Sequence, residues 1–287
     1  MLVILTAIGA AIAFAASQIC VRRGLSHAPP MTAVTISIIT MTTFVWLTLG
    51  PSIPKNDFSY TAVLLFMVSG TFSPLATQIL LYSSATRLGI SRASPLRNTT
   101  PLFASLLAIA VLGERWTLSI ASGTFFIVLG AILIGMRESG KVHGFRRVYL
   151  LLPLGAAMLG GIGSPMRKFA LSLIPSVPVA TTAVMTGAMM GLLVYLAISG
   201  TYKEVVIDRS ALLWFGLGGL FSSVGIGGNV AALKMGSVVV VSPLIATVPL
   251  WIVMLTAVFL RAYEQVTVKV ALGATSICLG GILLTVF

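Results

Sequence analysis

Residues 94–102 read SPLRNTTPL and residues 242–250 read SPLIATVPL, so the pattern SPL-x-x-T-x-P-L occurs twice in the chain. A second set of residues follows each copy and recurs 150 positions later: Glu114, Thr117, Gly123 and Gly130 return as Glu264, Thr267, Gly273 and Gly280. Two upstream matches keep the same order: Arg87-Leu88-Gly89 with Lys234-Met235-Gly236, and Gly9-Ala10-Ala11 and Arg22-Arg23 with Gly155-Ala156-Ala157 and Arg167-Lys168. Four matches in one order indicate an internal duplication.

The composition around these motifs is that of a membrane protein. Of the 287 residues, 57% are hydrophobic and 8% are charged, and the mean hydropathy is +1.07. A soluble domain carries about 25% charged residues, because its surface faces water. The apolar runs here are continuous and about 20 residues long, which favours membrane-spanning helices over the alternating strands of a barrel. The sequence therefore predicts an all-α integral membrane protein.

Ten apolar runs are long enough to be spans: 2–21, 31–50, 60–84, 91–112, 117–136, 149–168, 177–199, 211–233, 238–260 and 266–287. They divide into a five-helix repeat over residues 1–136, a connecting loop over 137–148 and a second repeat over 149–287. Five is an odd number, so the second repeat is expected to insert upside down relative to the first. Inverted repeats of this kind are typical of secondary transporters.

The ending of the fourth span adds a resemblance to a known family. Each half has a proline-bearing fourth span, an acidic residue just after it and a fifth span punctuated by glycine. With Leu112-Gly113-Glu114-Arg115 closing the fourth span, the whole chain resembles the EamA-type branch of the drug/metabolite transporter superfamily, although Arg261-Ala262-Tyr263-Glu264 departs from that ending. The resemblance implies a ten-helix fold, alternating access and export of small metabolites or amino acids.

Polar side chains inside hydrocarbon are costly, so their positions predict where a solute passes. On the fourth span, Ser94 and Asn98 share one helical face with Arg97 close by, and Gln78 and Tyr82 share a face of the third span. The predicted substrate-binding residues are Arg97, Asn98, Gln78, Tyr82, Gln18, Ser94, Ser164, Asn229 and Ser242. The alternative is that these groups hydrogen-bond between packed helices.

Prolines occupy equivalent places in the two halves. Pro95 and Pro101 correspond to Pro243 and Pro249. Each removes a backbone donor and frees carbonyl groups one turn earlier. Such breaks at membrane depth are tolerated where they meet protein or a water-filled cavity. The four prolines are predicted to kink the fourth and ninth spans beside the transport path and to take part in gating. The alternative is that they form static packing kinks.

Arg97 is the most informative charge. It lies about 9 Å into its span at 1.5 Å per residue, and no Asp, Glu or His stands in the middle of any predicted span. Arg97 therefore either extends to the interface, or faces the path and meets a carboxylate or phosphate on the solute, or pairs with an acid at a span end such as Glu264. The lack of a titratable acid or histidine at mid-span disfavours proton coupling.

We expect a secondary transporter that moves a small metabolite, an amino acid or an organic anion, by alternating access. The alternatives are a flippase for a lipid or lipid-linked head group, and a non-transporting membrane partner that kept a carrier fold. The sequence contains no nucleophile–base pair, metal-ligand cluster or phosphate-binding glycine loop, so we predict no enzymatic activity, cofactor or metal. The expected partners are the solute and the bilayer, without nucleic acid, for a monomer or homodimer.

The basic residues predict the orientation in a cell or inner membrane. The odd-numbered connections hold eleven Lys and Arg residues: Arg22, Arg23, Arg87, Arg92, Arg137, Lys141, Arg146, Arg147, Lys203, Arg209 and Arg261. The even-numbered connections hold five: Lys55, Arg115, Arg167, Lys168 and Lys234. The positive-inside rule places the odd connections in the cytoplasm and both termini outside, whereas the family resemblance suggests cytoplasmic termini.

Overall fold

The structure is a computed structural model that describes residues 1–54, 59–88, 96–135, 147–259 and 268–286. Within these ranges the chain consists of helices and their connections, without a strand. The longer helices are α1 (Leu2–Gly24), α2 (Pro30–Leu49), α3 (Tyr60–Gly70), α4 (Thr77–Leu88), α6 (Thr100–Leu112), α7 (Leu118–Gly135), α8 (Leu151–Leu173), α9 (Val177–Ser199), α10 (Arg209–Met235), α11 (Val238–Ile245), α12 (Val248–Phe259) and α13 (Val268–Val286). Short helical turns are η1 (Gly50–Ser52), η2 (Thr71–Ala76), η3 (Arg147–Leu150) and η4 (Thr201–Glu204).

Among the described residues, seven helical segments are long and apolar enough to cross a membrane: Leu2–Gly24, Pro30–Ser52, Tyr60–Ser84, Val148–Leu173, Val177–Ser199, Arg209–Met235 and Val238–Thr256. Three shorter apolar helices, Thr100–Leu112, Leu118–Ile134 and Lys269–Leu284, fall within the predicted fourth, fifth and tenth runs. Large apolar side chains such as Leu118 and Ile198 are 87% and 83% exposed, as expected where lipid is the solvent. The prediction of an all-helical membrane protein is confirmed.

Three of the apolar segments are interrupted. Between α3 and α4 the chain passes through η2, in which Ser73 has an extended backbone (φ −145°, ψ 110°) before Pro74. A two-residue turn at Asn98–Thr99 precedes α6, and a matching turn at Ala246–Thr247 separates α11 from α12. Pro101 and Pro249 follow these turns at the second position of the next helix, where a missing N–H costs least.

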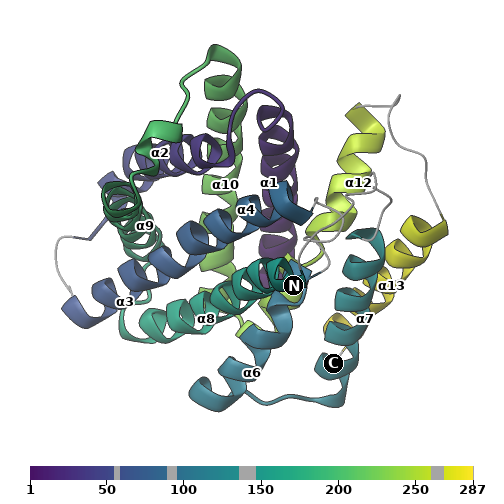
Figure 1. Ribbon diagram of the computed structural model, residues 1–287. Coiled ribbons are helices and arrows are strands. Elements are labelled where there is room, and N and C mark those ends of the chain that lie inside the picture. The colour runs from purple at the N-terminus through teal and green to yellow at the C-terminus, as the bar shows by residue number, and fades with distance from the viewer. Residues whose placement is uncertain (55–58, 89–95, 136–146, 260–267, 287) are drawn as a thin grey trace.

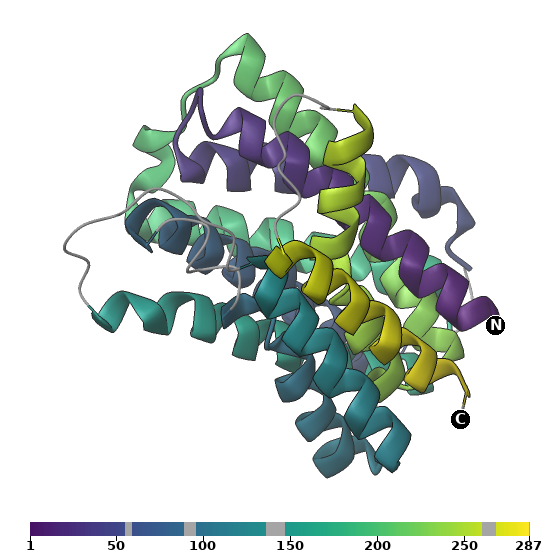
Figure 2. The ribbon, with the colours of Figure 1, turned by 90° about the vertical axis from the view of Figure 1, so that its right-hand side faces the viewer.

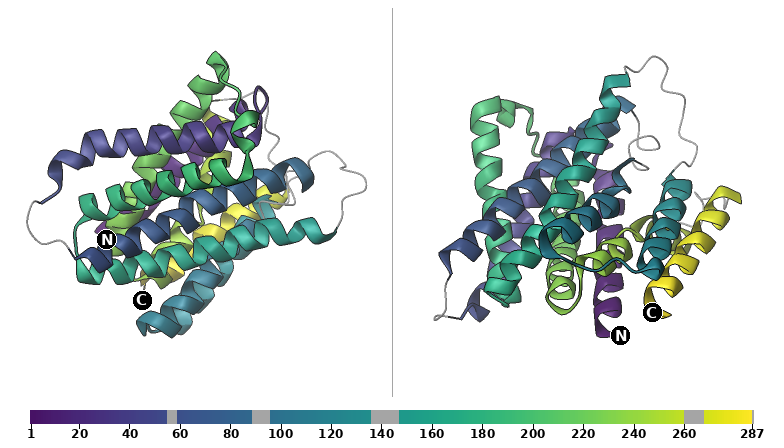
Figure 3. Two further views of the ribbon diagram at one scale, coloured as in Figure 1. Left: turned by 60° about the vertical axis from the view of Figure 1, so that its left-hand side comes forward. Right: turned by 90° about the horizontal axis from the view of Figure 1, so that it is seen from below.

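The helices pack in pairs that cross between the two halves of the chain. Helix α1 lies along α10, and α8 lies along α3 and α4. Helix α2 packs against α10, and α9 packs against α3; α2 and α9 also contact each other. Helix α6 packs against α8, while α1 packs against α11 and α12. Figure 3 shows this interleaving from two directions.

Helices α7 and α13 lie side by side at one edge of the bundle (Figure 1). Glycines permit this close approach. A Cβ on Gly123 would lie 2.9 Å from the carbonyl oxygen of Gly280, and a Cβ on Gly280 would lie 2.6 Å from that of Gly123. Gly130 and Gly273 oppose each other in the same reciprocal way, so the two helices run antiparallel. Small residues at helix contacts are the usual means of tight packing in membranes.

One expectation about the sixth span was wrong. Arg167 and Lys168 were expected to end that span and to belong to a connection. Helix α8 instead continues to Leu173, and Arg167 is 3% exposed. Both head groups bind backbone carbonyls of other segments, which lowers the cost of their burial.

Candidate functional site

Arg97, Tyr82 and Gln78 form a polar group where α4 meets the chain leading into α6. The Arg97 guanidinium and the Tyr82 phenol interact electrostatically. Gln78 lies one helical turn before Tyr82 on the same face of α4. The Gln78 Oε1 atom is buried and has no hydrogen-bond partner in the described ranges. A buried amide oxygen of this kind calls for a donor from water or from a solute.

The turn before α6 is held by side chains. Asn98 Nδ2 donates to the carbonyl oxygen of Ala131 in α7 over 3.0 Å, which ties this turn to the neighbouring helix. Thr99 Oγ1 donates to Leu96 O at 2.6 Å, and Thr100 Oγ1 donates to Arg97 O at 2.7 Å. Arg97 O is the carbonyl that Pro101 leaves without its usual N–H donor, so Thr100 supplies the replacement.

The second half repeats part of this arrangement. Thr247 Oγ1 donates to Leu244 O at 2.7 Å, as Thr99 does to Leu96 O. Pro243 lies inside α11 and Pro249 opens α12. Val248 stands where the first half has Thr100, so the second half lacks that hydroxyl. Ser94 and Pro95 lie outside the described residues.

The remaining predicted site residues lie on α1, α8, α10 and α11. Ser164 and Gln18 are half-buried, while Asn229 and Ser242 are buried. The Oδ1 atom of Asn229 is buried without a hydrogen-bond partner among the described residues, like that of Gln78. Beside Gln18, the hydroxyls of Ser17 and Ser222 share a 2.6 Å hydrogen bond that joins α1 to α10. The contacts do not place these residues together with Arg97.

Sequence reasoning missed Arg167 as an interior residue. Its Nε donates to Gly163 O at 3.1 Å, one turn earlier in α8, and one terminal nitrogen donates to Ser73 O at 3.3 Å. Ser73 is the interruption between α3 and α4, where helical bonding fails and a carbonyl needs another donor. The apolar residues from Phe169 to Leu173 were the signal that the helix continues past this arginine.

The contacts of Glu114 and Lys168 were also missed by the sequence reasoning. The Glu114 carboxylate accepts hydrogen bonds from the backbone N–H groups of Val238 and Val239, at 2.8 and 3.0 Å. Lys168 Nζ donates to Leu233 O and Gly236 O, both at 2.7 Å. Glu114 and Lys168 also interact electrostatically. The recurrence of Glu114 as Glu264 was a signal of its importance, but the sequence does not show its partners.

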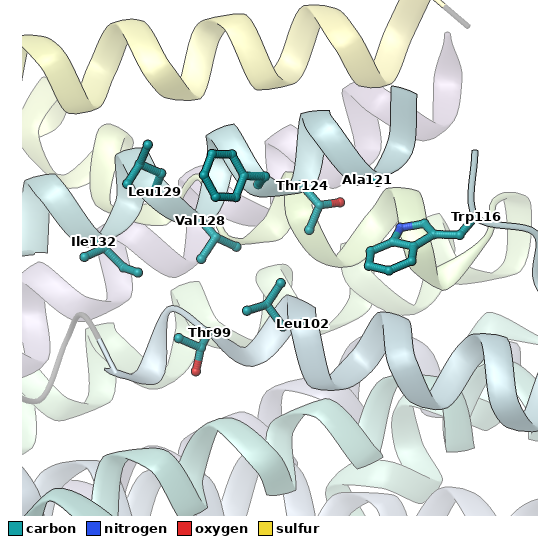
Figure 4. Close-up of a pocket in the computed structure, with 9 residues that line it drawn as sticks. Thr99, Leu102, Trp116, Ala121, Thr124, Val128, Leu129 and Ile132 are labelled. Carbon is teal, nitrogen blue, oxygen red and sulfur yellow. The ribbon is translucent and has the colours of Figure 1, made fainter. Parts of the chain in front are cut away.

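An apolar groove of about 390 Å³ lies between α6 and α7. Figure 4 shows Trp116 at one end, Ile132 at the other, and Thr99 and Leu102 on the facing side. Phe125, which also lines it, is 60% exposed on the outside of the bundle. The groove therefore suits an apolar chain rather than a charged solute.

Comparison with known proteins supports this architecture. Residues 1–136 match the model of the EamA-like transporter family. Twenty-nine chains of solved structures match the structure. One of them, a crystal structure of a protein, gives a TM-score of 0.77 at 15% identity, covering 99% of this chain and 96% of that one. At this identity the likeness shows the fold alone.

No curated protein matches the sequence at a significant level. The family match and the apolar helices agree on a multi-pass membrane protein of the transporter type. The first half of the chain, residues 1–136, matches the EamA-like transporter family, which belongs to the drug/metabolite transporter superfamily.

Proposed function

We propose that the protein is a secondary transporter for a small anionic metabolite, working by alternating access between two inverted five-span halves. The observation that carries the proposal is the reciprocal contact of α7 and α13. Gly123 faces Gly280 and Gly130 faces Gly273, so exchanging each residue with its repeat counterpart 150 positions away returns the same two contacts. A two-fold axis in the membrane plane would give this antiparallel, self-matching pair.

The other helix contacts support the same relation. In the proposed repeat, α1 corresponds to α8, α2 to α9, α3 and α4 to α10, and α6 to α11 and α12. If each helix is exchanged with its counterpart, the α1–α10 contact becomes the contact of α8 with α3 and α4. The α2–α10 contact becomes α9–α3, and α6–α8 becomes the contact of α1 with α11 and α12. The family match ends at residue 136, where the proposed first repeat ends. Two halves that can exchange conformations are the basis of alternating access.

The proposed solute is anionic because of Arg97. Within the described ranges, the titratable group that interacts with Arg97 is the phenol of Tyr82, not a carboxylate. An arginine inside the bilayer needs a counter-charge or water to offset its desolvation. A solute carboxylate or phosphate would supply the charge, and the unpartnered Gln78 Oε1 would accept a donor from the same solute.

We propose export as the direction and an inner or cell membrane as the location. With Arg167 and Lys168 inside α8, the even-numbered connections keep Lys55, Arg115 and Lys234 against eleven basic residues in the odd ones. This strengthens the bias that places the termini outside. Figure 2 shows both termini at one end of the bundle. The test is a reporter that is active only in the cytoplasm, fused to the C-terminus. Activity of this fusion would overturn the proposed orientation.

The test of function begins with purified protein and a thermal-shift screen of metabolites that includes carboxylates and phosphates. Each compound that raises the melting temperature is then tested for uptake into preloaded liposomes. Counterflow of an anionic compound, absent from empty liposomes, is the expected result. Stabilisation by cations alone, or no exchange of any stabilising compound, would contradict the proposal.

The second candidate is a flippase for a lipid or lipid-linked head group. The observation in its favour is the apolar groove between α6 and α7, which borders Thr99 in the turn that follows Arg97 and opens to the outside of the bundle. An acyl chain could occupy it while a head group reached Arg97. Movement of a fluorescent anionic lipid between leaflets by the purified protein, without metabolite exchange, would favour this function.

A further inference from the structure

Glu114 takes the place of an N-cap for a helix in the other half. Helix α11 begins at Val238, and its N-cap residue Ser237 makes no side-chain capping bond. The first N–H groups of a helix have no partner within the helix and favour a negative charge. The Glu114 carboxylate receives two of them, from Val238 and Val239, although it lies 124 residues away from Val238 in the chain.

Gly113 places the carboxylate there. Helix α6 ends at Leu112, and Gly113 has φ 65° and ψ 23°, a left-handed conformation that side chains other than glycine rarely adopt. Glu114 N then donates to Ala108 O at 3.3 Å, which turns the chain back over the end of α6. The Leu112-Gly113-Glu114 ending therefore fixes where the carboxylate points.

Lys168 binds the other side of the same connection. Helix α10 ends at Met235, and its last carbonyl groups lack helical donors. Lys168 Nζ donates to Leu233 O in that last turn and to Gly236 O just beyond it. A cation at a helix C-terminus is favoured by the helix dipole. Since Lys168 also interacts with Glu114, the two side chains hold the Gly236–Ser237 connection from both ends.

These bonds join segments of both halves at one end of the bundle. Glu114 belongs to the end of α6 in the first half, whereas Lys168 is in α8 and its partners are in α10 and just beyond it, in the second half. Helix α11 also packs against α6. The bonds involve a carboxylate, an ammonium and four backbone groups, with distances of 2.7–3.0 Å. Separation of the halves at this end would break the bonds that Glu114 makes.

At the opposite end only the counterpart of Lys168 can be compared, because Glu264, the counterpart of Glu114, lies outside the described residues. Arg22-Arg23 correspond to Arg167-Lys168 in the repeat. Both Arg22 and Arg23 are exposed, and Arg23 lies over the ring of Trp214 at 5.0 Å. The Arg23 side chain makes no hydrogen bond to a carbonyl at the end of α4 in the part of the chain that is described, although Lys168 makes two at the end of α10. Arg23 and Lys168 therefore make different contacts at the two ends.

We propose that Glu114 and Lys168 form a gate that closes the transport path at the end where α8 and α10 finish and α11 begins. The proposal rests on the alternating-access function above. The structure is then the state closed at this end, and the path opens here when Glu114 leaves α11 and Lys168 leaves α10.

Distances between spin labels test the gate without any solute, in a background in which Cys20 and Cys278 are replaced. One label pair, at Arg115 and Met235, spans the gate between the halves; a second pair, at Arg87 and Arg209, spans the opposite end, and all four sites are exposed. The test variants are Glu114→Gln and Lys168→Met. The matched controls are Glu204→Gln and Lys234→Met, since Glu204 and Lys234 are exposed.

At the gate, the label pair should show a short distance in closed molecules and a long distance in open ones. We expect each test variant to raise the ratio of the long-distance population to the short-distance population by about tenfold, because each hydrogen bond to a charged group is worth a factor of this order. The pair at the opposite end should shorten in the same samples. The charge swap Glu114→Lys with Lys168→Glu should not restore the short distance, because each side chain would then meet a helix end of the same sign.

Three results would overturn the gate. Unchanged distances in variants that remain folded and monodisperse would show that the bonds do not hold the closed state. A longer gate distance without change at the opposite end would show local fraying. Rescue by the charge swap would show that the contact is a simple ion pair to which the helix ends do not contribute. Because no solute is present, failure of uptake leaves this measurement unaffected, so failure of the gate and failure of the proposed function are distinguishable.

Discussion

Arg167 donates a hydrogen bond to the carbonyl oxygen of Ser73, 3.3 Å away, at the residue where the segment containing α3 and α4 departs from helical geometry. The bond joins α8 to an interruption that would otherwise leave a buried acceptor unsatisfied. It accounts for a fully buried arginine without a carboxylate partner among the described residues. The role of Arg167 is thus first of all to support a broken helix.

Replacing Arg167 with Met should destabilise the protein. The change leaves Ser73 O without its side-chain donor, and an unsatisfied buried acceptor costs about 1–3 kcal/mol. It also removes the second bond to Gly163 O, which keeps the backbone N–H of residue 167 as its helical donor. Thermal unfolding in detergent measures the effect. Arg115→Met is the control, because Arg115 is exposed. Equal melting temperatures for the two variants would show that Ser73 O does not depend on Arg167.

The contact of α7 with α13 should be intolerant of one added methyl group at Gly280. In Gly280→Ala the Cβ would meet Gly123 O at 2.6 Å and Ile127 N at 2.8 Å, both of them backbone atoms. Overpacking of this kind costs about 1–3 kcal/mol. Gly281→Ala is a matched control, since nothing lies within 4 Å of its Cβ. We expect a lower melting temperature for the first variant only; similar values would argue against the close helix pair.

Gly113→Ala should weaken the protein through the backbone alone. No atom lies within 4 Å of a Cβ at Gly113, but φ is +65°. The left-handed conformation costs an alanine about 1–2 kcal/mol. Gly216→Ala, also with open space around it, is the control.

Asparagine adopts this conformation more readily, so Gly113→Asn should recover part of the stability. Because Gly113 aims Glu114 at α11, Gly113→Ala should also lengthen the gate distance. An alanine variant as stable as the wild type would contradict the assigned turn.

Arg97→Gln should reduce the affinity for the transported anion by at least about tenfold, since a charge-assisted hydrogen bond is worth roughly 1.5–3 kcal/mol. Affinity is measured by the concentration dependence of the thermal shift or of counterflow. Tyr82→Phe should have a smaller effect, because it keeps the ring and removes the hydroxyl. Arg115→Gln is the control. Full affinity in Arg97→Gln would remove the basis for an anionic solute.

The positions of the helices were predictable because each apolar run has the length of a membrane crossing. The turns at Asn98–Thr99 and Ala246–Thr247 lie one turn ahead of Pro101 and Pro249, where a missing N–H disturbs a helix. The predicted end of the sixth span was wrong because two adjacent cations commonly mark the end of a span, whereas α8 continues past them. Here the carbonyl groups that accept them belong to other segments, which the local sequence does not reveal.

For the candidate site, the sequence predicted which residues share a helix face but not their partners in other helices. The four-residue spacing of Gln78 and Tyr82 places them on one face of α4, and Arg97 interacts with Tyr82. The partner of Glu114 could not be predicted, since the N-terminus of α11 comes 124 residues later and meets Glu114 through the tertiary fold. The hydrogen bond from Asn98 to a backbone carbonyl of α7 could not be predicted either, because it depends on the position of that helix.

Arg167 and Lys168 are neighbours in α8, so their side chains leave the helix about 100° apart. One is fastened to the segment between α3 and α4, and the other to the end of α10. While both are attached, α8 cannot roll about its own axis; it can only tilt or slide together with its two neighbours. If the hydrogen bonds of Lys168 break while that of Arg167 remains, α8 can rotate about the contact that Arg167 makes. Rotation of α8 is therefore restricted to the state in which Lys168 is not bound to the end of α10.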